Sequence, residues 1–351
     1  MNEATAIERR QNFPQAEVDE VTLDGRKVRV TNVELDIDEV TLDPSNPRIV
    51  NTLALSLDDG QEVQKRLEAI LWEDPDVRDL YRQVLINKGL IERIIVRRDG
   101  RVVEGNCRTV VYRKLRQSKP NDKAWQTIPA RLLPEDIADR EVAILLGEMH
   151  VAGKNTWSAF EKAGHIYRLH RDFALTQEEI AHRFRMSKSK VNQLVKSFEL
   201  MRSKFLQNYP SASNIRKFSY FEEAYKNPKL REWITSDPAA EDQFVAWVGD
   251  GKLPLGTSVR ELVAIVANSD AFQAMNESGF AAAKRVLEAD DPAVTSRLFR
   301  RMKEMTEELE QARLDDIQRV RTDHNPAAKK IAKDLERALR HFLELCDVDR
   351  H

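Results

Sequence analysis

The chain has 351 residues, of which 41% are hydrophobic and 32% charged, and its formal net charge is −2. This length allows two or three domains with hydrophobic cores, and the hydrophobic content excludes a wholly disordered chain. No apolar run approaches the roughly 18 residues of a membrane span, and the first residues lack the apolar core of a secretory signal. The two cysteines, Cys107 and Cys346, argue against a disulfide framework. These features predict a cytoplasmic protein without a membrane partner.

Basic residues gather in one segment of this nearly neutral chain. Residues 154–204 contain eleven lysines and arginines against five acidic residues, a surplus of six. A local basic patch is typical of a domain that contacts phosphates, and a solvated charged helix face is the alternative.

The first 150 residues mix strand and helix patterns. Residues 1–16 are polar, and we expect them to be flexible. Hairpins are expected at Asp24-Gly25 and Asp99-Gly100, because both pairs favour tight turns between alternating apolar and polar residues. Further expected elements are helical segments within residues 58–88 and 109–117, a strand in IPARLLP and a helix in DIADREVAILLGEMH. The sequence thus predicts a small mixed α/β domain over residues 17–150.

The remaining residues are almost entirely helical in pattern, so the predicted fold class is α+β. Proline and glycine divide them into residues 151–205, a helical domain over 206–290 and a C-terminal region over 291–351. A heptad seam in the C-terminal region consists of Leu298, Met302, Met305, Leu309 and Ala312. A second amphipathic helix follows, with Asn325 as its expected cap. These helices could form a hairpin or a dimer interface, and the sequence leaves both open.

The segment TQEEIAHRFRMSKSKVNQLVKSFEL, from Thr176 to Leu200, has the pattern of a helix-turn-helix. Thr176 and Ser187 are expected to cap its two helices, and Glu179 completes a capping box with Thr176. Arg185 occupies the turn position that glycine usually takes. A left-handed conformation at such a residue costs roughly 1 kcal/mol, which a turn tolerates.

The residues expected to contact DNA lie at the starts and on the outer face of these two helices. They are Gln177, Ser187, Lys188, Ser189, Lys190, Asn192 and Gln193. Asparagine and glutamine can read adenine edges, whereas serine and lysine contact phosphate or guanine. The sequence therefore predicts binding to double-stranded DNA, and an ordinary helical hairpin is the alternative.

Several segments, in order, resemble the ParB family of chromosome and plasmid partition proteins. They are LDPSNPRIV, NKGLIERIIV, EGNCRTVV, IPARLL and LLGEMHVAGKNTWSAFEKAGHIYRL, between about residues 36 and 201. The resemblance implies a ParB/sulfiredoxin-like fold followed by a helix-turn-helix DNA-binding domain, in a nucleoid-associated protein that is expected to be a homodimer. It also implies that CTP binds the N-terminal domain with Mg²⁺ and is hydrolysed there.

Applied to this chain, the resemblance implies a nucleotide site at the junction between a strand and the helix that follows it. The residues that would meet the triphosphate are Gly105, Asn106, Arg108 and Thr109. A glycine turn of this kind also directs backbone N–H groups at an anion, which arginine can clamp in a bidentate manner. Glu148 falls at the family's catalytic and metal-associated glutamate.

Departures from the family pattern leave other functions open. Cys107 replaces the first arginine of a double-arginine pair, and Met149 replaces an asparagine, although a thioether is a poor Mg²⁺ ligand. Arg108 could instead pair with Glu104 and cap the turn. The second hypothesis is therefore a ParB/sulfiredoxin-fold enzyme, such as a nucleotide hydrolase, a phosphotransferase or a nuclease from a mobile element or defence system.

Two further interpretations concern single residue types. Cys107 at a helix start beside an arginine could be a reactive thiol, but a lone cysteine is more often a small buried side chain. Asp36, Asp38 and Asp43 could form a nuclease cluster, but acidic residues at alternate positions beside a strand are more often its solvent face.

Overall fold

The computed structural model of the chain describes residues 17–23, 25–46, 63–152, 157–290, 292–321 and 326–346. The expected flexible segment 1–16, Asp24 of the first hairpin and the expected cap Asn325 lie outside these residues. The chain divides into two compact units, one up to Val263 and one from Ala264 onward.

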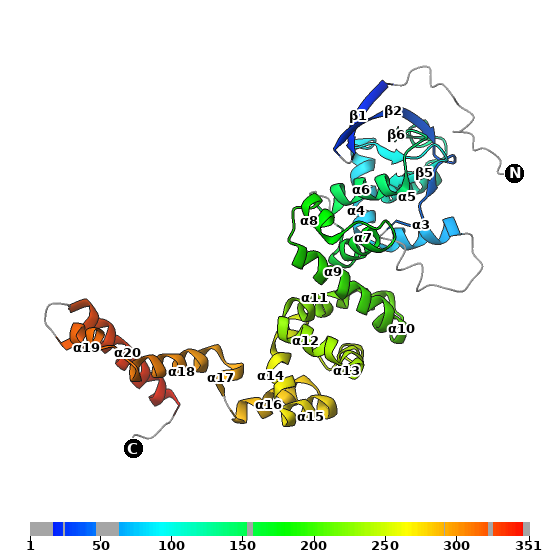
Figure 1. Ribbon diagram of the computed structural model, residues 1–351. Helices are drawn as coiled ribbons and strands as arrows, with labels where there is room; N and C mark the ends of the chain where they lie inside the picture. Colours follow the sequence, from blue (N-terminus) through cyan, green and yellow to red (C-terminus); the bar gives the residue numbers. More distant parts are fainter. Residues whose placement is uncertain are drawn as a thin grey trace. The chain divides into compact units, whose positions relative to one another are not determined.

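A mixed β-sheet forms the N-terminal part of the first unit, drawn in blue to cyan in Figure 1. Its strands are β1 (Glu17–Leu23), β2 (Arg26–Asp36), β3 (Thr41–Leu42), β4 (Ile94–Val96), β5 (Arg101–Glu104) and β6 (Thr127–Leu132). Their order in the sheet is β1-β2-β6-β4-β5-β3. The β4–β6 and β3–β5 pairs are parallel, and the other neighbours are antiparallel.

Both expected hairpins are confirmed by the strand pairing. β1 pairs antiparallel with β2, and Gly25 in the turn between them has a φ of 75°. β4 pairs antiparallel with β5, and Gly100 has a φ of 85°. Both glycines adopt the left-handed conformation that hairpin turns of this kind require.

Helices pack on both faces of the sheet. They are α3 (Val63–Glu73), α4 (Pro75–Asn87), α5 (Asn106–Ser118) and α6 (Asp139–His150), with a short turn η1 (Lys123–Trp125). Ile94 and Val96 of β4 join the core beneath α4 and α5, whereas Ile95 joins the core beneath α6. This division follows from the pleat, because successive strand residues point to opposite faces.

Two helical segments differ in extent from the expectation. The segment within residues 58–88 contains two helices, because Asp74 accepts a hydrogen bond from the Asp76 amide and Pro75 starts α4. The helix expected at 109–117 begins at Asn106, directly after β5. A glycine at position 105 allows this abrupt change from strand to helix.

The rest of the first unit is helical. Its elements are α7 (Ala159–Arg171), α8 (Gln177–Arg183), α9 (Lys188–Leu200), η2 (Met201–Phe205), α10 (Leu206–Asn208), η3 (Ala212–Lys217), α11 (Phe218–Lys226), α12 (Pro228–Ser236), α13 (Pro238–Gly249) and η4 (Gly256–Glu261). Phe160 of α7 contacts both Phe198 and Phe218, with ring centroids 5.1 and 5.7 Å apart. These buried rings pack α7, α9 and α11 together.

The last helices are less well covered. They are α14 (Leu262–Ala267), α15 (Ser269–Ser278), α16 (Phe280–Asp290), α17 (Pro292–Thr295), α18 (Arg297–Glu310), α19 (Leu314–Arg321) and α20 (Pro326–Leu345). None of the described residues in α18, α19 or α20 is buried. The heptad seam ends with α18, so Ala312 lies beyond its helix.

The structure confirms the predicted α+β class, with a mixed sheet domain followed by helices. None of the described helices is long and apolar enough to cross a membrane.

Candidate functional site

The first turn of α5 forms one wall of a cavity. Gly105 precedes this helix with a φ of 105°, and a Cβ atom there would lie 2.5 Å from Cγ2 of Ile94. Glycine is therefore required both for the backbone conformation and for the close approach of β4. The backbone N–H groups of the first helical turn have no acceptor within their own helix.

The cavity has a volume of about 680 Å³, within the range of small-molecule sites. One wall is the side of α4 that carries Val77, Leu80, Gln83, Val84 and Asn87. The opposite wall consists of Glu104 to Arg108, together with His150 and Trp157. Apolar and amide groups thus face a polar, partly charged wall.

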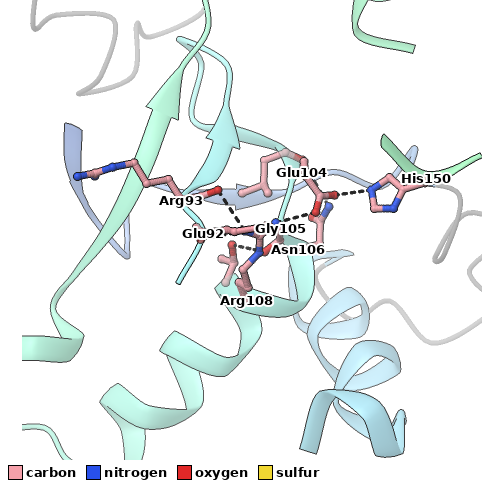
Figure 2. A network of polar contacts seen from close by, with 9 residues as sticks. Glu92, Arg93, Glu104, Gly105, Asn106, Arg108 and His150 are labelled. Atoms are coloured by element: carbon pink, nitrogen blue, oxygen red, sulfur yellow. Dashed lines mark hydrogen bonds and ion pairs between the residues drawn. The ribbon is translucent and has the colours of Figure 1, made fainter. Parts of the chain in front are cut away.

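Arg108 is held by neighbouring groups of its own domain (Figure 2). One guanidinium nitrogen donates to the carbonyl oxygens of Glu92 and Arg93, at 2.8 and 3.1 Å. The other lies 2.7 Å from the Glu104 carboxylate, and both side chains of this pair are largely buried. The pairing of Arg108 with Glu104, one of the two alternatives in the sequence, is therefore present.

Glu104 also binds His150, as Figure 2 shows on its opposite side. The Nε2 atom of His150 lies 2.9 Å from Oε2 of Glu104. Burial raises the pKa of the Glu104 carboxyl, but the contacts with His150 and Arg108 lower it by more, so the net shift is downward. Glu104 is thus a buried carboxylate shared between two basic side chains.

Aromatic contacts lead from His150 to the helix-turn-helix. The ring of His150 stacks on Trp157 at 4.3 Å, and Trp157 contacts the edge of His165 at 4.9 Å. Burial lowers the pKa of His165 to about 3, so this ring is neutral and Nε2 donates to the Ala143 carbonyl. A Cβ atom on Gly147 would lie 2.8 Å from Cε1 of Phe184, which ends α8.

Two residues that were predicted to contact a phosphate use their side chains for other hydrogen bonds. The Asn106 amide oxygen accepts from the Asp43 backbone N–H at 3.0 Å, and its nitrogen faces the Val102 carbonyl. Asn106 therefore lines the cavity but uses its side chain to hold the loop after β3. Thr109 is fully buried, donates to the Gly105 carbonyl and lies outside the cavity lining, which corrects its predicted place.

Glu148 is likewise absent from the residues that line the cavity, where His150 of the same helix stands instead. The resemblance implies Mg²⁺, but the described donors form no site that would hold it by protein ligands alone. No three histidine, cysteine, aspartate or glutamate residues of the described chain form a group that could hold a metal ion. Glu104 is already bound by Arg108 and His150, so we assign no step to a metal.

The contacts of Cys107 and of the three aspartates favour structural roles over reactive ones. Cys107 lines the cavity but packs against the core that contains Leu71, as a small apolar side chain does. Asp36 and Asp38 are exposed and pair with Arg116, the latter at 2.7 Å. Asp43 is buried, and its carboxylate accepts hydrogen bonds from Ser45. The three aspartates therefore form no nuclease cluster.

α8 and α9 are two helices joined by a short turn, and their caps are those predicted from the sequence. Thr176 and Glu179 form the capping box of α8, and Ser187 accepts from the Lys190 amide at the start of α9. Arg185 has a φ of 54°, which confirms the left-handed turn residue. The sequence thus predicted both helix starts and the turn between them.

The outer face of α9 is less open than its sequence suggests. Ser187, Lys188 and Ser189 are exposed, and Gln177 of α8 donates to Asn192 at 3.4 Å. Lys190 is only partly exposed and pairs with Glu222 of α11 at 2.5 Å. The predicted exposure of Gln193 is wrong, because α11 covers it and its amide donates to the Glu222 carbonyl.

Two features of the cavity were not assigned from the sequence. They are Trp157 and Glu104, the latter considered only as a partner of Arg108. Their contacts with His150 join residues far apart in the chain, for which single-sequence spacing gives no signal.

A comparison with solved structures finds similarity to the C-terminally truncated chromosome-partitioning protein ParB from Caulobacter crescentus. For its complex with the centromeric parS site, identity is 18% over 66% of this chain and 97% of that chain, with a TM-score of 0.33. For its complex with CTP-γ-S, identity is 18% over 61% and 98%, with a TM-score of 0.21. No known protein family and no curated protein matches the chain.

Proposed function

We propose that this protein binds double-stranded DNA through α8 and α9 and that a nucleotide in the cavity controls that binding. The observation that carries the proposal is the series of packed rings from the cavity to His165 of α7, the helix that contacts α8 and α9. His150 lines the cavity and stacks on Trp157, which in turn contacts His165. A ligand that moves His150 therefore acts on the packing beneath the helix-turn-helix.

The DNA-contacting surface is the exposed start of α9. Ser187, Lys188 and Ser189 are exposed there, beside the free N–H end of a 13-residue helix. Gln177 and Asn192, which bind each other, are the side chains next to this end that can pair with base edges. We leave Gln193 out of this surface because it is buried.

The nucleotide would lie between α4 and α5. The apolar side chains of α4, with Gln83 and Asn87, suit a base and a sugar, and the first turn of α5 suits a phosphate. The cavity volume of about 680 Å³ is sufficient for a nucleotide. The motif resemblance to ParB supports the same placement.

The test begins with DNA. Duplexes that the purified protein retains from a random library supply the binding sequence. Fluorescence anisotropy then measures affinity with and without cytosine, adenine and guanine nucleotides, each as the monophosphate and as the triphosphate. We expect one nucleotide to change the DNA affinity at fixed salt. A protein that retains no duplex at low salt would remove the DNA proposal.

Trp157→Leu tests whether the ring contacts carry the control. We expect this variant still to bind DNA and still to bind the nucleotide. The nucleotide should, however, no longer change its affinity for DNA. Trp233→Leu is the matched control, because Trp233 also stacks on an aromatic ring, Trp247, but lies on α12. An unchanged nucleotide effect in Trp157→Leu would contradict the proposed route.

We further propose that the C-terminal helices bind a second copy of the chain. α20 exposes Ile331, Leu335, Leu339 and Leu343 at intervals of four, and α18 exposes Leu298, Met305 and Leu309. Such an apolar stripe is costly to leave in water and, at these spacings, suits a helix of the same kind. Phe299 of α18 also contacts Phe342 of α20, so the two helices offer a common face.

Sedimentation velocity measures this association directly. We expect a dimer for the unchanged chain and a monomer for Leu335→Glu/Leu339→Glu. Leu255→Glu is the control, since Leu255 is also an exposed leucine but lies before these helices. A monomeric unchanged chain at micromolar concentration would reject the dimer.

A further inference from the structure

The side chains around the cavity carry more negative than positive charge. Asp76, Glu92 and Glu104 are its acidic lining residues, and Arg108 and His150 are its basic ones. The formal charge is therefore −2 with a neutral His150 and −1 with a protonated one. Each further phosphate group on a ligand adds repulsion, chiefly from the largely buried Glu104, because Asp76 and Glu92 are exposed to solvent.

Glu104 already binds Arg108 and His150, the two basic side chains that would otherwise attract a phosphate. Its two carboxylate oxygens take one guanidinium nitrogen of Arg108 at 2.7 Å and Nε2 of His150 at 2.9 Å. The side chain of Glu104 is 12% exposed, so it cannot simply turn into solvent when a ligand arrives. A phosphate that approaches Arg108 must displace this carboxylate or lie beside it.

Arg108 itself has little freedom to move toward a ligand. Its other guanidinium nitrogen donates to the backbone carbonyls of Glu92 and Arg93, and its side chain is 13% exposed. The amides of the first α5 turn remain as the phosphate site.

We propose that Glu104 is a specificity-determining residue that restricts the cavity to nucleosides and nucleoside monophosphates and disfavours triphosphates. The proposal rests on the nucleotide function of the cavity. It differs from the family resemblance, which implies CTP with Mg²⁺. The cavity then responds to a ligand whose negative charge is low.

Isothermal titration calorimetry tests this with cytidine, CMP and CTP in EDTA, and again with Mg²⁺. For the unchanged protein we expect CMP to bind more tightly than CTP. In Glu104→Gln, CTP affinity should rise on the order of tenfold, CMP affinity less, and cytidine affinity not at all. The gain should thus increase with the number of phosphates.

Two control variants separate charge from position. Glu92→Gln removes a carboxylate that lies 3.8 Å from the same guanidinium but is 67% exposed, so solvent already screens it and the gain in CTP affinity should be smaller than in Glu104→Gln. Glu104→Asp keeps the charge and should keep the preference for CMP. Circular dichroism and thermal unfolding show whether each variant is folded.

Several outcomes would overturn the proposal. One is tighter binding of CTP than CMP by the unchanged protein in EDTA, which needs no variant at all. Another is an equal gain for cytidine and CTP in Glu104→Gln, which would indicate a general change in the cavity. If CTP binds strongly and Glu104→Gln leaves its affinity unchanged, the selectivity role of Glu104 is rejected. The nucleotide function of the cavity is not. If no member of the series binds any variant, the selectivity proposed for Glu104 is rejected, and the DNA and nucleotide titrations described above decide the proposed function separately.

Discussion

Two helices of the first unit begin where an anion could bind, and their surroundings differ. α5 begins at Asn106 inside a cavity, beside Arg108 and Glu104, whose side chains are 13% and 12% exposed. α9 begins at Lys188 on the surface, where Ser187 and Ser189 are exposed. The same backbone geometry therefore supplies a selective site in one place and an open one in the other.

The difference lies in what neutralises the positive side chains. Within the cavity, Glu104 holds Arg108 away from water, where an ion pair is strong and its rearrangement is costly. At the surface, Lys188 pairs with Glu178, but both side chains are more than 60% exposed and solvent weakens the pair. A DNA phosphate can replace a surface partner far more easily than a ligand phosphate can replace a buried one.

The largest expected effect comes from the start of α5. Gly105→Ala should lower the free energy of unfolding by roughly 3 kcal/mol, because it combines backbone strain with a clash against Ile94. Urea denaturation measures the change. Gly25→Ala is the control: its φ is 75° and a Cβ atom would meet nothing within 4 Å, so only about 1 kcal/mol of strain is expected. Equal losses for both variants would show that the approach of β4 is unimportant.

The second effect concerns the pH dependence of the buried pair. The pKa of Glu104 is lower in the folded state, so its contribution to stability is present above the unfolded pKa and disappears as the pH falls through the folded one. Glu104→Gln should cost roughly 2 kcal/mol at neutral pH, and the difference from the unchanged protein should shrink below about pH 4. Urea denaturation at a series of pH values measures it. A difference that is constant with pH would reject the ion-pair account.

A smaller effect is expected at the start of α9. Ser187→Ala removes the side chain that accepts from the Lys190 amide and should cost about 1 kcal/mol of stability. Ser189→Ala, two residues later on the exposed side, should leave stability nearly unchanged. Thermal unfolding compares the two variants. A loss of the same size for Ser189→Ala would indicate that Ser187 is not the effective cap.

The smallest effect concerns DNA and is a change in salt dependence. Lys188→Ala should reduce the slope of the logarithm of DNA affinity against the logarithm of salt concentration by about 1, because one phosphate contact is lost. Lys226→Ala is the control, since this lysine is similarly exposed and paired, with Glu223, but lies on α11. Anisotropy titrations at several salt concentrations give both slopes. Identical slopes for the two variants would remove α9 from the interface.

Local patterns predicted the local structure well. The capping residues Thr176 and Ser187, the left-handed Arg185 and the turns at Gly25 and Gly100 are all present as expected. Each depends on hydrogen bonds and backbone preferences within a few residues, which a sequence displays directly. Gly105 belongs to the same class, although its helix starts earlier than its apolar spacing suggested.

Predictions about side-chain exposure were less successful. Gln193 has the period of an outward-facing residue, yet α11 packs over it, and Thr109 is buried although it follows the glycine turn closely. Both depend on elements that arrive from elsewhere in the chain. A single helix cannot indicate which of its polar faces another helix will cover.

The sequence by itself determined the order of strands and helices, the caps and turns, and the position of the glycine that opens the cavity. Only the tertiary structure decided which charges meet within that cavity. Glu104, Arg108 and His150 come from three elements, β5, α5 and α6, and are brought together by the packing of α6 against the sheet. Hydrogen-bonded turns are local in the chain, whereas burial and ion pairing depend on distant residues, and these set the charge that a ligand meets.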